Sequence, residues 1–114
     1  MQLERQDYGE AILIKVDERR IDAAVAIQFK DRLRELAGTE PARVVLDVTQ
    51  VDFLDSSGLG AVVAAMKQLG AGRKLELAGL SPMVEKVFRL TRMDTVFTIH
   101  KDASAAVVGL AHVT

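Results

Sequence analysis

The chain has 114 residues with a hydrophobic content of 49%, and its 15 basic and 16 acidic residues give a formal net charge of −1. This length accommodates one domain with one core, spanning residues 1–114, and the balanced charge gives no long-range field that would draw the chain to nucleic acid or to anionic lipid. The chain has no Cys, which excludes disulfides, thiol catalysis and Cys-based metal sites, and its aromatic content of 4% argues against a base-stacking surface.

The start of the chain predicts a β-hairpin. Leu3 and Arg5 alternate weakly, as in a short edge strand, and residues 7–10 (Asp-Tyr-Gly-Glu) form a turn. Residues 11–16 (Ala-Ile-Leu-Ile-Lys-Val) then form a second strand. Because the loop is short, we expect the two strands to pair antiparallel.

A helix should follow the hairpin. Residues 17–20 are a charged loop, and Asp22 has a side chain suited to an N-cap. Gly38 is placed to end the helix, since glycine accepts the left-handed backbone that often follows a last helical turn. The apolar residues between these two positions recur at helical spacing: Val25, Phe29, Leu33 and Leu36.

The middle of the chain predicts a buried strand followed directly by a second helix. Residues 44–48 (Val-Val-Leu-Asp-Val) are too few for a buried helix and rich in β-branched side chains, which is typical of a central strand covered on both faces. Asp47 within this strand needs a polar partner if it is buried. Residues 55–58 (Asp-Ser-Ser-Gly) supply side-chain oxygens that can cap a helix. The apolar face of that helix consists of Leu59, Val62, Val63, Met66 and Leu69.

The last third of the chain repeats the alternation of strand and helix. Residues 75–78 predict a strand, residues 81–82 (Ser-Pro) the start of a helix, and residues 96–99 a final strand. Asp102 should cap a last helix that continues to Leu110. This order indicates an α/β fold, with a mixed, mostly parallel sheet, an N-terminal β-hairpin and flanking helices.

The serines Ser56 and Ser57 stand just past the carboxyl end of the central strand, where ligands and chemistry gather in open α/β sheets. A nucleophile elbow would need glycine two residues before and two residues after its serine, but Leu54 and Asp55 occupy the preceding positions. The stretch also lacks the Gly-Lys-Ser/Thr ending of a phosphate loop, and the nearby carboxylates form no visible metal cage. We therefore expect a protein that is not an enzyme.

Two interpretations of these serines stay open on the sequence alone. Serine at a helix start commonly caps the helix, at about 1 kcal/mol. Alternatively, an exposed hydroxyl accepts a phosphoryl group, which adds about −1.5 to −2 charges near the positive end of the helix dipole. Gly58 and Gly60 carry a similar ambiguity, because glycine in a first helical turn permits either close approach of another molecule or tight packing against the protein's own sheet.

Residues 53–60 (Phe-Leu-Asp-Ser-Ser-Gly-Leu-Gly) resemble the signature of STAS domains that act as bacterial anti-sigma-factor antagonists, and the resemblance extends over essentially the whole chain. It implies that Ser56 is phosphorylated by a serine-kinase anti-sigma factor. The unphosphorylated antagonist would bind that kinase and release its sigma factor by partner switching, and a metal-dependent serine phosphatase would reset the cycle. ATP and Mg²⁺ belong to the kinase, so no cofactor is expected in this chain. The partner-binding residues implied by the resemblance are Asp22, Asp55, Ser56, Ser57, Gly58, Leu59 and Gly60.

The resemblance has one departure, in the loop before the first helix. This chain keeps Ile21 and Asp22 of the family pattern but has Arg19 where the family usually has glycine. The conformation of the loop is therefore open, and the loop becomes a candidate for partner choice. By the same resemblance Asp22 is expected near Ser56, and capping of the first helix is its alternative role.

We expect a cytoplasmic phosphoprotein of signal transduction and transcription regulation that is monomeric when free and has no nucleic-acid or membrane partner. The sequence has neither a leader-like apolar segment after a basic start nor an apolar run long enough to span a bilayer. The alternative is a STAS subunit that scaffolds or regulates a stress-sensing or lipid-transport complex constitutively. The regulated pathway, whether transcription, secretion or motility, is not identified by the sequence.

Overall fold

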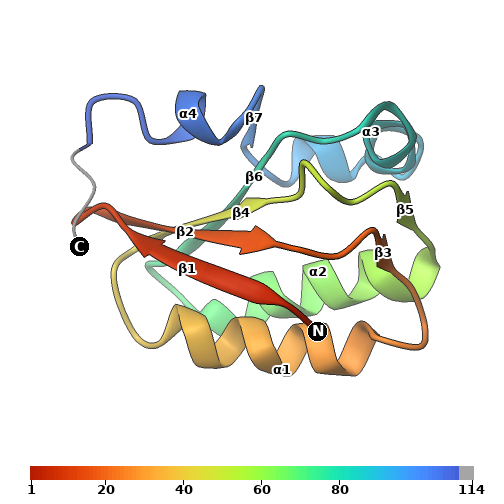
Figure 1. The fold of residues 1–114 in the computed structure, drawn as a ribbon, viewed down its shortest axis with the longest axis horizontal. Helices are drawn as coiled ribbons and strands as arrows, with labels where there is room; N and C mark the ends of the chain where they lie inside the picture. The colour runs from red at the N-terminus through yellow and green to blue at the C-terminus, as the bar shows by residue number, and fades with distance from the viewer. Residues whose placement is uncertain (111–114) are drawn as a thin grey trace.

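A five-stranded sheet organises the protein, whose computed structural model describes residues 1–110 (Figure 1). In spatial order the strands are β1 (Leu3–Asp7), β2 (Ala11–Val16), β4 (Arg43–Asp47), β6 (Lys74–Ala78) and β7 (Ile99–His100). β1 is antiparallel to β2, and the other neighbouring pairs are parallel, so the predicted hairpin and the mixed, mostly parallel sheet are confirmed. Residues 111–114, the end of the expected domain, lie outside the described residues.

Two long helices cover one face of this sheet. They are α1 (Ala26–Ala37) and α2 (Ser56–Leu69), which lie side by side beneath the strands in Figure 1. The main hydrophobic core fills the space between these helices and the sheet. Three adjacent strands supply fully buried side chains to it: Ile14, Leu46 and Leu77.

A third helix closes the main core at the end where the strands finish. It is α3 (Pro82–Leu90), and a single 3₁₀ turn, η1 (Met93–Thr95), follows it. The hydroxyl of Ser81 accepts from the backbone N–H of Val84 at 3.4 Å, so this helix starts as predicted. The rings of Phe88 and Phe97 meet edge to face with their centroids 5.8 Å apart, which ties α3 to the chain that follows it.

The opposite face of the sheet carries a much smaller apolar cluster. A short helix, α4 (Ala103–Ala106), lies over this face, and β4 alternates between the two sides because successive strand residues point in opposite directions. Val44 and Leu46 therefore join the main core, whereas Val45 packs under α4. The buried residues of this second cluster are Leu13, Val45, Ala78, Ala106 and Val107.

Helix α1 begins later than predicted. Its N-cap is Val25, which makes no side-chain capping bond. Asp22 starts a turn instead: its carboxylate accepts from the Ala24 N–H at 3.1 Å, and its carbonyl accepts from the Val25 N–H at 3.1 Å. The prediction that Asp22 caps α1 is therefore wrong. Gly38 does end the helix, with a φ of 55°.

The predicted final strand exists, but its bounds are Ile99–His100 and not residues 96–99. Only Ile99–His100 pairs with β6, because the chain first coils through η1 and then turns to bury Phe97. α4 starts as predicted, since the Asp102 carboxylate accepts from the Ala105 N–H at 2.8 Å. It ends at Ala106 instead of Leu110, where β-branched valines follow.

Candidate functional site

A small second sheet holds the serine-containing segment against the loop that precedes α1. It consists of β3 (Arg20–Ile21) and β5 (Phe53–Leu54), which pair in parallel, with Arg20 opposite Phe53 and Ile21 opposite Leu54. The sequence analysis did not predict this sheet. Because both strands run in the same direction, the residues that follow them, Asp22 and Asp55, emerge at one end of the sheet.

Asp55 joins these two segments through its carboxylate. One oxygen accepts from the Gly58 N–H at 2.8 Å and so caps α2, while the other accepts from the Ala23 N–H at 3.2 Å. A single side chain thereby starts α2 and fixes the loop that contains Asp22. This contact places the loop beside the serine segment, while the expected position of Asp22 near Ser56 itself stays a prediction.

Both serine hydroxyls are left free by this arrangement. Ser56 and Ser57 are exposed in the first turn of α2, and no hydrogen bond among residues 1–110 involves either hydroxyl. The interpretation of the serines as caps is wrong, because Asp55 takes that role. An exposed hydroxyl at the positive end of a 14-residue helix remains available for chemistry.

The two glycines of this turn have different surroundings. A Cβ on Gly58 would overlap the carbonyl oxygen of Ile21 and lie 2.8 Å from its carbonyl carbon, so this glycine allows α2 to pack closely on β3. A Cβ on Gly60 would meet nothing within 4 Å. Gly58 thus serves the fold, whereas Gly60 leaves open surface beside Ser56.

Arg19 and Arg20 form the rim of the site on the side of β3. The Arg19 guanidinium donates to Asp52 at 3.0 and 2.6 Å, and Arg20 lies over the Phe53 ring with 4.5 Å to its centroid. Arg92 is the one non-glycine residue among 1–110 with a positive φ. Arg19 therefore does not have a positive φ, and its backbone conformation does not require glycine. The departure from the family pattern adds the ion pair between Arg19 and Asp52.

Two grooves flank the first turn of α2. The α2–η1 groove has a volume of about 420 Å³ and is lined by Ser56, Leu59, Gly60, Val63, Ala64, Lys67, Thr91 and Met93. The α1–α2 groove has a volume of about 200 Å³ and is lined by Ala26, Ile27, Lys30, Ser57, Gly60, Ala61 and Ala64. Each serine therefore borders a different groove. Leu59 and Val63, predicted as core residues, are only partly buried.

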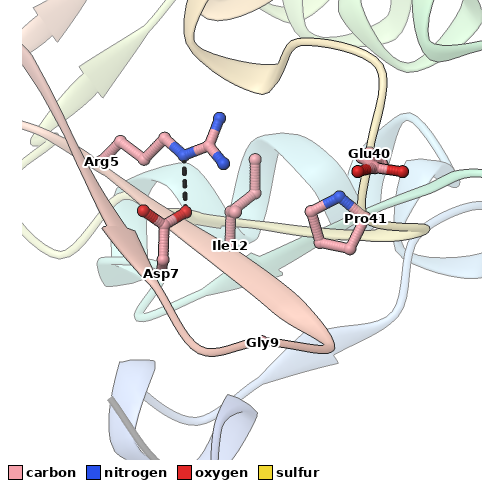
Figure 2. A pocket seen from close by; sticks show the side chains of 6 residues that line it. All are labelled: Arg5, Asp7, Gly9, Ile12, Glu40 and Pro41. Atoms are coloured by element: carbon pink, nitrogen blue, oxygen red, sulfur yellow. Dashed lines mark hydrogen bonds and ion pairs between the residues drawn. The ribbon is translucent and has the colours of Figure 1, made fainter. Parts of the chain in front are cut away.

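A further hollow of about 430 Å³ lies at the other end of the strands (Figure 2). Gly9, just before β2, and Pro41, just before β4, belong to its lining, so it sits where these parallel strands begin. Its arginine, Arg5, is already engaged: the guanidinium contacts Asp7 at 2.7 Å and the Leu36 carbonyl at 2.6 Å. This hollow is remote from the serines, and its lining among residues 1–110 includes no free cation.

The sequence analysis missed a polar network under α4. Glu76, with 5% of its surface exposed, accepts from the Arg43 guanidinium at 2.7 and 2.8 Å and contacts His100 Nε2 at 2.7 Å. Arg43 also donates to the Ala106 carbonyl at 2.9 Å. The hydrogen bonds from Arg43, opposed by burial and aided by His100, hold the pKa of Glu76 below its ordinary value. The sequence did offer a signal for this network: Glu76 is an acidic residue between two leucines of a predicted strand.

The other expected polar partner is found beside β4. Asp47 accepts from the backbone N–H of Thr49 at 3.0 Å and from its hydroxyl.

Within residues 1–110 no group of three or more His, Cys, Asp or Glu side chains is arranged to hold a metal ion. In the same range, the helices fall short of the length and apolar character needed to cross a bilayer.

The fold and the site together define a small α/β domain that presents a free serine at a helix start. The family model described as the STAS domain matches residues 2–106, and the chain belongs to this family. An anti-sigma-B factor antagonist from Listeria monocytogenes is 34% identical over 80 residues, which cover 69% of this chain and 70% of the relative.

Solved structures share the same fold. The crystal structure of an anti-sigma factor antagonist from Mycobacterium paratuberculosis has a TM-score of 0.83 and 21% identity, covering 96% of this chain and 92% of that one. The Bacillus cell fate determinant SpoIIAA in its phosphorylated form has a TM-score of 0.66 and 23% identity, covering 93% of this chain and 95% of that one. At these identities the likeness establishes the fold alone.

Proposed function

We propose that this protein is an anti-sigma-factor antagonist whose unphosphorylated form binds a serine-kinase anti-sigma factor and releases the bound sigma factor. Phosphorylation of Ser56 by that kinase ends the binding. The observation that carries this proposal is the exposed Ser56 hydroxyl, which has no hydrogen-bond partner among residues 1–110 and follows a capping aspartate. The name of the Listeria relative and the phosphorylated state of SpoIIAA support it.

A phosphate on Ser56 would disturb binding more than folding. It adds about −1.5 to −2 charges, which the N-terminal end of α2 tolerates in water. No hydrogen bond among residues 1–110 is lost, because Asp55 and not Ser56 caps the helix. A docked partner, in contrast, must desolvate the phosphate beside the carboxylate of Asp55, the residue directly before Ser56. One group therefore switches the interface and leaves the fold intact.

The proposal assigns distinct roles to the surrounding residues. Asp55 holds the serine segment, Gly58 fixes the helix on β3, and Asp22, Ser57, Leu59 and Gly60 belong to the surface that the kinase covers. ATP and Mg²⁺ come with the kinase, and a metal-dependent phosphatase restores the hydroxyl. The chain itself acts as substrate and binding module, and it works as a monomer until the kinase binds.

Titration calorimetry against the kinase tests this proposal. We expect Ser56→Ala to bind like the wild type, whereas Ser56→Asp and the phosphoprotein bind at least about tenfold more weakly, since like-charge contacts at an interface cost more than 1.4 kcal/mol. The phosphoprotein should show the larger effect, because a carboxylate carries less charge than a phosphate. Peptide mass spectrometry after incubation with kinase, ATP and Mg²⁺ should place one phosphate on Ser56.

Ser57→Ala is the matched control, because it removes the neighbouring exposed hydroxyl from the same helical turn. It should still accept one phosphate, on Ser56. Phosphate found reproducibly on Ser57 would contradict the assignment of Ser56. Equal affinities for all the variants and the phosphoprotein would instead favour a constitutive scaffolding subunit.

A further inference from the structure

We infer that the kinase docks in the α2–η1 groove, and that it fills this groove with an amphipathic helix carrying an acidic residue. The inference rests on the proposed function and specifies the surface through which it operates. It adds Val63, Lys67 and Met93 to the partner-binding residues, and it predicts that the α1–α2 groove stays free.

The α2–η1 groove leads directly to the phosphate acceptor. Ser56, Gly60, Val63 and Lys67 follow one another along α2 at intervals of four, three and four residues, which places them in one stripe on the helix. The groove is lined by all four of these residues. A segment seated along the stripe would therefore end at the Ser56 hydroxyl.

The floor of the groove is apolar and wide enough for side chains. Leu59, Val63 and Met93 are partly buried against the main core, and all three line the groove. Gly60 has no side chain, so nothing at this position blocks a partner that approaches Ser56 along the groove. Apolar anchors of a helix laid into such a groove supply affinity by burying this surface.

One cation at the far end of the groove selects the charge of the occupant. Lys67 is exposed and forms no ion pair among residues 1–110. It lies 11 residues beyond Ser56, or about 16 Å along the helix axis at 1.5 Å per residue. An acidic side chain on the docked helix would pair with Lys67 while the opposite end of that helix approaches Ser56.

The groove on the other side of α2 provides an internal comparison. The α1–α2 groove also contains one lysine without an ion pair within the described residues, Lys30, and one exposed apolar residue, Ile27. It has about half the volume and borders Ser57 instead of Ser56. A partner seated there would present the wrong hydroxyl to its active site.

Site-specific photocrosslinking in the cells from which the sequence comes tests the inference. A benzoylphenylalanine replaces Lys67 in one variant and Lys30 in the other. We expect the position 67 variant to cross-link a protein with a kinase ATP-binding domain, and the position 30 variant to give no such product. Cross-linking of the kinase from position 30 alone would overturn the inference and leave the proposed function standing.

The remaining outcomes are also informative. Cross-linking from position 67 of proteins that have neither a kinase nor a phosphatase domain, with no kinase product, would overturn the inferred occupant. No cross-link from either position would overturn the inference, while calorimetry against the kinase would decide the proposed function separately.

Phosphorylation kinetics give a second readout with matched variants. Lys67→Glu should raise the KM of the kinase for this substrate about tenfold with little change in kcat, because charge reversal acts on docking. Lys30→Glu should leave the KM unchanged. Met93→Gln should raise the KM as well, whereas Ile27→Gln, which alters a residue with 71% of its surface exposed, should not. An unchanged KM in both groove variants would overturn the inference.

Discussion

Gly58 and Gly60 stand two residues apart in the same helical turn, yet only one of them is required by the fold. The backbone of Ile21 occupies the space that a side chain at position 58 would need, while position 60 faces open surface. The sequence pattern Gly-x-Gly gave no means of separating these roles. Each glycine destabilises the helix relative to alanine. At position 60, no contact within the described part of the chain offsets this loss.

Alanine substitution should change the stability of the protein in opposite directions at the two glycines. Gly60→Ala should stabilise the protein by about 1 kcal/mol, because alanine favours the helix and meets no obstruction. Gly58→Ala should destabilise it by roughly 1–3 kcal/mol, since overpacking forces α2 away from β3. Thermal unfolding followed by circular dichroism measures both. A Gly58→Ala variant as stable as the wild type would mean that α2 does not rest on Ile21 in solution.

The identity of the capping residue shows the limit of sequence reasoning at this scale. Asp55, Ser56 and Ser57 are adjacent and all have side chains that cap helices. Which of them caps depends on where the helix begins. If the helix began one residue later, Ser56 would be the cap and its hydroxyl would no longer be free. Asp55 starts the helix because its second oxygen also binds Ala23, a contact across 32 residues that no local pattern reveals.

At the scale of elements, the large regular pieces were predictable and the short ones were not. β2, β4, α2 and α3 carry enough apolar residues at a clear spacing to define their type. β3 and β5 have two residues each, which is too short for any periodicity to appear. Their pairing nevertheless builds the site, because it brings Asp22 and Asp55 to the same end.

The second face of the sheet depends on Glu76, and this dependence should be visible as a function of pH. The lowered pKa means that ionised Glu76 stabilises the fold at pH values above the ordinary Glu pKa of about 4.3, and that this contribution is lost as the pH falls further. Glu76→Gln should therefore lower the free energy of unfolding at pH 7 by roughly 2–4 kcal/mol and reduce the acid-dependent loss. Urea unfolding between pH 3 and pH 7, values chosen to bracket roughly the ordinary Glu pKa, gives both quantities.

Glu85→Gln is the control for this experiment. Glu85 pairs with Arg89 at 3.3 Å on the surface of α3, where both side chains are more than half exposed. Its removal should change the free energy of unfolding by less than about 0.5 kcal/mol, because exposed pairs contribute little. Equal effects of the two substitutions would contradict the role of the buried network.

For the molecule as a whole, stability and switching should respond to different residues. Leu46→Asp should unfold the domain, because Leu46 is fully buried in β4 and an unpaired charge would enter the main core. Ser56→Ala should change the melting temperature very little, since its hydroxyl forms no hydrogen bond among residues 1–110. Thermal denaturation distinguishes the two. Comparable destabilisation by both would make Ser56 a structural residue.

The architecture of the whole chain was predictable from the order of its strands and helices, because the spacing of apolar residues within each segment indicates its type. A hairpin, then strands alternating with amphipathic helices, admits few topologies once crossovers are right-handed and connections are short. The failure lies where the chain folds back on itself: residues 96–98 stay outside β7, and in this segment the buried Phe97 packs edge to face on Phe88.

The unequal division of the core between the two sheet faces has a consequence for how the protein opens. The main core joins β1, β2, β4 and β6 to α1, α2 and α3, whereas α4 contributes one buried residue, Ala106, to the smaller cluster, and the Ala106 carbonyl accepts a hydrogen bond from Arg43. Detachment of α4 would uncover that small cluster and leave the larger core closed. Amide protons of α4 should then exchange through a low-energy local opening, while those of β4 wait for global unfolding. Ser56 lies on α2, which packs into the main core, so we expect the geometry around Ser56 to persist while α4 opens at the other face.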